Sequence, residues 1–164
     1  MRRGIALTAI VGGLLLTLSA PAAAATADGG PGTIAYVSDA TGDDEVMIMS
    51  VDGAQQRRLT ENAGPDRAPA WNPDGTSIVF NSRRDPHAGR PQLYVIDVAT
   101  GSSERVTDSA AEDQRASWSA DGATLYLQRG VFFAQAYNLV AHTLADGSEL
   151  TLTDSSASHI WNAA

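Results

Sequence analysis

The sequence contains neither cysteine nor lysine, and each absence removes classes of function. With no cysteine among its 164 residues, the chain cannot be a disulfide scaffold, a thiol catalyst or a cysteine–zinc protein. All 11 basic residues are arginines, against 19 acidic residues, and the formal net charge is −8. Such a chain can neutralise few phosphates, so we expect no nucleic-acid partner and no attraction to anionic membrane surfaces.

Catalytic signatures are missing as well. The chain has no Gly-x-Ser-x-Gly elbow, and no glycine-rich loop that precedes a helix and could cradle phosphate. Its three histidines, His87, His142 and His159, do not share a metal-site spacing. The acidic stretch at residues 39–45 does not match the twelve-residue calcium loop and is predicted to be solvated. We therefore predict no catalytic residue, no metal site and no cofactor.

The first 27 residues have the three-part layout of a secretory signal peptide. Arg2 and Arg3 give a positive start, an apolar run covers residues 5–18, and small residues lead to a predicted cleavage after Ala27. The apolar run is shorter than the roughly 20 residues needed to span a bilayer. We expect a secreted, or periplasmic and extracytoplasmic, protein with no membrane span after cleavage; an uncleaved anchor is the alternative. Residues 28–32 are predicted to be a linker.

Sequence markers recur at a spacing of about 47 residues in the rest of the chain. One marker is a tryptophan, followed in its first two occurrences by an Asp-Gly turn, and a second is a triplet that ends at Thr60, Thr107 and Thr153. The residues of the first marker are Trp71, Asp74, Gly75, Trp118, Asp121, Gly122 and Trp161. Because both markers stay in phase, the sequence predicts repeats over about residues 33–75, 76–122 and 123–164.

Each repeat has the pattern of four short strands. The Asp-Gly pairs predict tight hairpin turns, in which glycine accepts the left-handed conformation. Apolar runs such as residues 78–80 and 93–96 are typical of strands covered on both faces. Four-stranded units at this period indicate propeller blades. The predicted fold is all-β: a partial β-propeller of about three four-stranded antiparallel blades.

These residues resemble the repeats of TolB-like β-propellers. The stretch at residues 38–49, followed by Asp52-Gly53 and residues 57–60, looks like that repeat, and residues 71–75 resemble the family's Trp-x-Pro-Asp-Gly signature. The resemblance covers about residues 33–162. The later part departs from the pattern, since Ala120 replaces the proline and no Pro-Asp-Gly follows Trp161.

The resemblance implies a protein-interaction scaffold of the cell envelope. We expect a secreted, non-enzymatic binding or scaffold module whose partner is a protein, peptide or saccharide. The candidate partner-binding residues are His159, on a strand expected to line the central channel, and the adjacent aromatics Phe132 and Phe133. Two alternatives stay open: a hydrolase or lyase type of propeller that uses channel residues, and a truncated remnant of a longer propeller protein.

Counting strands predicts a head-to-tail homodimer. The chain provides strands two to four of one blade, two whole blades, and a lone first-type strand at residues 158–161. Closed propellers need about 4–8 blades, and the family resemblance implies six. Two copies would complete a six-bladed ring, and an open three-blade array is the alternative.

Overall fold

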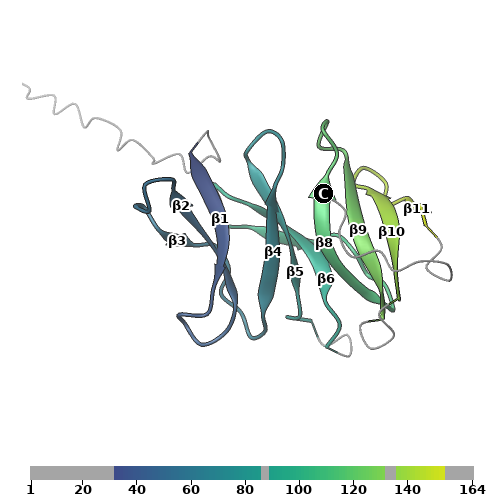
Figure 1. The fold of residues 1–164 in the computed structure, drawn as a ribbon, viewed down its shortest axis with the longest axis horizontal. Coiled ribbons are helices and arrows are strands. Elements are labelled where there is room, and N and C mark those ends of the chain that lie inside the picture. Colours follow the sequence, from purple (N-terminus) through teal and green to yellow (C-terminus); the bar gives the residue numbers. More distant parts are fainter. Residues whose placement is uncertain (1–31, 86–88, 132–135, 154–164) are drawn as a thin grey trace, which may run out of the picture.

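The computed structural model describes residues 32–85, 89–131 and 136–153, and the regular structure in these residues consists of β-strands alone (Figure 1). Sheet 1 contains β1 (Thr33–Ser38), β2 (Glu45–Ser50) and β3 (Arg57–Arg58). Sheet 2 contains β4 (Asp66–Trp71), β5 (Ser77–Ser82), β6 (Gln92–Asp97) and β7 (Ser103–Arg105). Sheet 3 contains β8 (Glu112–Trp118), β9 (Thr124–Val131), β10 (Ala136–Thr143) and β11 (Glu149–Thr151).

Within each sheet every strand pairs antiparallel with its neighbour along the chain. The three sheets stand in a row, with sheet 2 in the middle (Figure 1). The prediction of an all-β partial propeller is therefore confirmed. The lone strand expected at residues 158–161 lies outside the described residues.

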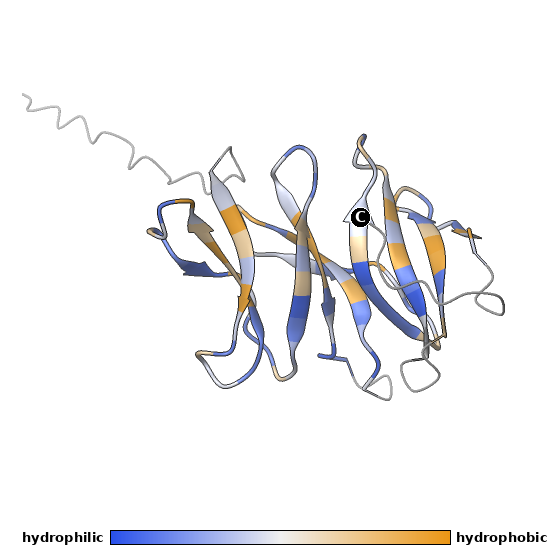
Figure 2. Cartoon of the chain, viewed as in Figure 1, coloured by the Kyte–Doolittle hydropathy of each residue, from blue (hydrophilic) through white to orange (hydrophobic). Residues whose placement is uncertain are grey.

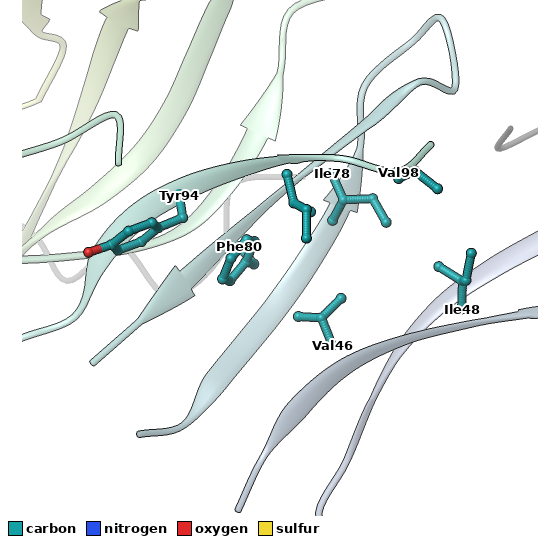
Figure 3. Packing of buried hydrophobic residues seen from close by; sticks show 7 residues of the cluster. Val46, Ile48, Ile78, Phe80, Tyr94 and Val98 are labelled. Carbon is teal, nitrogen blue, oxygen red and sulfur yellow. The ribbon is translucent and has the colours of Figure 1, made fainter. Parts of the chain in front are cut away.

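Two apolar clusters hold the three sheets together. Cluster 1 lies between sheets 1 and 2, and its side chains converge from both ribbons (Figure 3). Its buried members are Val46, Ile48, Ile78, Phe80, Tyr94, Ile96 and Val98. Cluster 2 lies between sheets 2 and 3, and its buried members are Val79, Leu93, Ala116, Leu125, Leu127 and Val140. Sheet 2 is thus covered on both faces, because alternate residues of its strands point to opposite sides.

One hydrogen bond recurs in every sheet and explains the threonine marker. The hydroxyl oxygens of Thr60, Thr107 and Thr153 each accept the N–H of a residue 14 positions earlier, always at 2.9 Å. The donors are Val46, Leu93 and Leu139. Each threonine follows the last strand of its sheet and fixes the chain to the strand beside it. We name this contact the threonine clasp.

The first strands of sheets 2 and 3, β4 and β8, each contain a β-bulge at the same position of the repeat. We call β4 and β8 the inner strands. Their pairing with the next strand shifts between Arg67 and Ala70, and between Gln114 and Ser117. Within these bulges Ala68 and Arg115 have φ angles of 52° and 51°. Left-handed backbone is uncommon outside glycine, and the two residues are 47 positions apart. The repeat therefore includes the bulge and its left-handed residue, which the residue types at these positions do not predict.

Candidate functional site

A shallow hollow of about 280 Å³ lies between two equivalent turns of neighbouring sheets. Its lining residues are Asn72, Pro73, Asp74, Ala120, Asp121 and Gly122. One turn connects β4 to β5 and the other connects β8 to β9. Gly75 and Gly122 have φ angles of 74° and 70°, the left-handed conformation that tight turns need. The Asp-Gly marker thus builds both sides of the hollow.

The two aspartates give the hollow a negative charge. Asp74 accepts hydrogen bonds from the Thr76 hydroxyl and the Thr76 N–H, at 2.7 and 2.8 Å, and these bonds lower its pKa. Asp121 accepts from the Ser119 hydroxyl at 2.5 Å and from the Ala123 N–H at 3.0 Å, and its pKa is lowered in the same way. Both carboxylates are ionised at neutral pH. The six lining residues include these two carboxylates and no basic residue, so the hollow is suited to binding a cationic or hydroxyl-bearing group.

The repeat tryptophans lie beside the two apolar clusters. Trp71 packs against cluster 1 and Trp118 against cluster 2. The Trp118 Nε1 also donates to the Ala70 carbonyl at 3.0 Å, which connects one inner strand to the next. The Trp71 Nε1 is buried and has no partner among the described residues. The described indoles therefore contribute to inter-sheet packing.

At the opposite end of sheet 2, a buried carboxylate is held by an arginine. Asp66 is fully buried and accepts from Arg84 at 2.7 Å and from the Asn62 side-chain amide at 2.6 Å. The Arg84 guanidinium lies over the rings of Phe80 and Tyr94, at 5.1 and 4.6 Å from their centroids. This stacking positions the cation, so the contact serves the structure of the sheet.

Tyr94 is not suited to acid–base chemistry at neutral pH. Burial, together with the hydrogen bond that its hydroxyl donates to Asp85, raises the pKa of Tyr94 to about 12. The phenol therefore stays protonated. It acts as a fixed hydrogen-bond donor at the edge of cluster 1.

Sheet 3 has a longer chain of charged contacts. Asp113 is fully buried and takes two hydrogen bonds from Arg129, at 2.6 and 2.9 Å. The same guanidinium binds Glu149, and Glu149 in turn lies 2.9 Å from the Nδ1 of His142. Asp66 and Asp113 thus both bind arginine side chains, which come from the adjacent strand or from the residues that follow it.

Stability should depend on pH through Glu149. The hydrogen bonds from Arg129 lower the pKa of Glu149 from 4.5 to about 2, with a further contribution from His142. A carboxylate whose pKa is depressed by folding stabilises the protein above its unfolded pKa, and this contribution is lost as the pH falls towards the folded value. We expect urea-unfolding free energies to fall between about pH 5 and pH 2, and to fall less steeply in Glu149→Gln.

A matched control for this series is Glu104→Gln, an exposed carboxylate on β7. It should leave the pH dependence as in the unmodified chain. Parallel pH profiles for the unmodified chain and Glu149→Gln would contradict the assignment.

Several predicted site residues lie outside the described residues. They are Phe132, Phe133, His159 and Trp161. Within residues 32–85, 89–131 and 136–153 there is no group of three or more His, Asp or Glu side chains placed to hold a metal ion. The same residues include no helix long and apolar enough to cross a membrane.

A family model described as the TolB beta propeller domain matches residues 17–162. A protein TolB homolog from Chlorobium luteolum is 33% identical over 69 residues, which are 42% of this chain and 15% of that protein. The chain therefore spans only a small part of this curated relative.

Solved propellers have a similar fold. The crystal structure of TolB from Acinetobacter baumannii has a TM-score of 0.65 and 26% identity, over 75% of this chain and 30% of that one. An oligogalacturonate lyase in complex with manganese has a TM-score of 0.61 at 17% identity, over 75% of this chain and 33% of that chain. This second likeness shows the fold alone. From the family match over most of its length, the chain belongs to the TolB beta propeller domain family.

Proposed function

We propose that this chain is a secreted, non-enzymatic propeller module that binds a protein, peptide or saccharide partner in the periplasm or outside the cell. Export rests on the leader-like layout of residues 1–27. The binding role rests on membership of a family that includes TolB proteins, together with the site chemistry. A rigid stack of sheets presents its turns in a fixed arrangement, which suits recognition.

The observation that carries the proposal is the hollow between the two Asp-Gly turns. Asp74 and Asp121 face one space of side-chain size, and the hydrogen bonds within each turn hold both carboxylates ionised. A cationic side chain, or the hydroxyl groups of a sugar, would complete their hydrogen bonding. Hydrogen bonds to charged groups are the stronger ones in binding.

The lyase or hydrolase alternative has less support from the described residues. The buried carboxylates Asp66 and Asp113 each bind an arginine, and His142 is buried against Glu149. These groups stabilise the sheets and are not exposed to a substrate. A fold shared with an oligogalacturonate lyase does not transfer its activity.

Binding can be tested with ligands selected against the exported chain from a displayed peptide library and a glycan array. Replacing both Asp74 and Asp121 with asparagine should weaken the selected ligand roughly tenfold or more, since each charged hydrogen bond is worth about 1.5–3 kcal/mol. Asp146→Asn is the matched control, because Asp146 caps a turn in the same way but does not line the hollow. Equal affinity in all variants would exclude this site.

Activity screens test the alternatives. We expect no turnover of oligogalacturonates, with or without manganese, and none of esters, lactones or peptides. Turnover that disappears in His142→Ala or His159→Ala would favour the enzyme. A non-cooperative thermal melt of the exported chain would favour a remnant of a longer propeller.

A further inference from the structure

The two ends of the sheet array carry exposed hydrophobic side chains, whereas sheet 2 does not. Among the described residues, the large hydrophobic side chains that are exposed are Ile34, Val37, Val51, Tyr126, Leu150 and Leu152. Figure 2 shows hydrophobic residues on β1 and β2 at one end of the row, and on β9 and β10 at the other. Exposed apolar residues gathered in this way mark an interaction surface.

The outer face of sheet 3 matches the sheet 2 face that packs on sheet 3. Tyr126, Ala141 and Leu150 lie opposite one another on three adjacent strands, so they share one face. Leu125, Leu127 and Val140 occupy the other face and belong to cluster 2. The repeat and the threonine clasp align the outer positions Tyr126, Leu139, Ala141 and Leu152 with Val79, Leu93, Val95 and Val106. Those sheet 2 residues are the ones packed in cluster 2.

The outer face of sheet 1 matches the face of sheet 2 that packs on sheet 1. Ile34 lies opposite Met49 as Ile78 lies opposite Ile96, and Tyr36 lies opposite Met47 as Phe80 lies opposite Tyr94. The N–H groups of Val51 and Val98 make the same hydrogen bond, to Gly32 and Thr76. The aligned sheet 2 residues are those that pack towards sheet 1 in cluster 1. The two outer faces are therefore the two halves of an interface that the chain already forms twice within itself.

A third observation comes from the indole nitrogens. The Trp118 Nε1 donates to a carbonyl on the preceding inner strand, at Ala70. Trp71 holds the equivalent place, but its buried Nε1 has no partner among the described residues. No described strand pairs with the outer edge of β1. The nitrogen thus lacks the carbonyl that an inner strand beside β1 would offer.

We propose that a second copy of this chain covers these faces head to tail, sheet 3 of each copy packing on sheet 1 of the other. Closed propellers have about 4–8 blades, so two copies of a three-sheet array fall within that range and three copies do not. The inference concerns assembly and is independent of the binding role proposed above.

The test is the molar mass of the full chain, recovered after expression and export, by light scattering over a range of concentrations. We expect twice the mass of the recovered chain. Val51→Glu and Tyr126→Glu alter one outer face each, and either should give a folded single-chain species with β-sheet circular dichroism. Ala99→Glu, at an exposed turn of sheet 2, is the matched control and should leave the mass doubled.

Mixing the two interface variants distinguishes the proposed geometry from a symmetric one. In the mixture, the intact sheet 1 face of Tyr126→Glu meets the intact sheet 3 face of Val51→Glu. Association should therefore return in part, which a same-face interface would not allow.

Three results would overturn the proposal. The first is a folded single-chain species of the unmodified protein at every concentration, and the second is an open polymer. The third is a dimer that only one of the two face substitutions disrupts, because association would then use the same face on both copies.

Discussion

Phe80→Ala is expected to lower the free energy of unfolding by about 3–5 kcal/mol, a large part of the 5–15 kcal/mol typical of a domain. Phe80 is fully buried at the centre of cluster 1 and stacks on Tyr94, with ring centroids 5.8 Å apart. Its ring also supports the Arg84 guanidinium that neutralises Asp66. The substitution removes apolar contact between sheets 1 and 2 and loosens the cation beside a buried carboxylate.

Urea unfolding followed by circular dichroism measures this loss. Phe80→Leu is the matched control, since it keeps most of the apolar volume and should cost less than about 1.5 kcal/mol. A similar small loss for both variants would mean that cluster 1 does not hold sheets 1 and 2 together.

Arg129→Met is expected to cost about 3–5 kcal/mol, because it leaves a buried charge without its partner. Asp113 is fully buried and takes both of its arginine hydrogen bonds from Arg129. Adding Asp113→Asn removes the unpaired charge, so the double variant should recover part of the loss. Unfolding in urea at neutral pH provides the measurement for all variants.

The control for this pair is an exposed ion pair. Arg58 binds Glu61, whose side chain is 82% exposed, and such pairs contribute about 1 kcal/mol or less. Arg58→Met should therefore have a small effect. Equal losses for Arg58→Met and Arg129→Met would show that burial of Asp113 does not determine the cost.

Much of the fold could be predicted because the chain repeats its own pattern. The triplets ending at Thr60, Thr107 and Thr153 were recognised as a marker, and the structure gives their reason: each hydroxyl bonds the same backbone position in its sheet. Apolar runs such as residues 93–96 predicted strands covered on both faces, and β6 lies between the two clusters. Local pattern and tertiary packing agree at these positions.

The charged contacts could not be predicted in the same way. Asp66 and Asp113 keep the repeat spacing, but their partners Arg84 and Arg129 are 18 and 16 residues further along. The arginines therefore do not recur in phase, and no periodic marker identifies them. The hollow was also missed, because it forms between two turns about 47 residues apart and depends on how the sheets pack.

The threonine clasp has a consequence for how such a chain can grow. In each sheet the threonine binds the residue 14 positions before it at the same distance. One repeat therefore contains both the donor and the acceptor of the clasp that ends its sheet. Duplicating the segment from Glu61 to Thr107 in tandem would insert one whole four-stranded sheet. Each threonine that ends a sheet would then still be followed by a segment that begins the next sheet. Gene duplication or a laboratory fusion could lengthen the array in this way without redesigning any contact between neighbours.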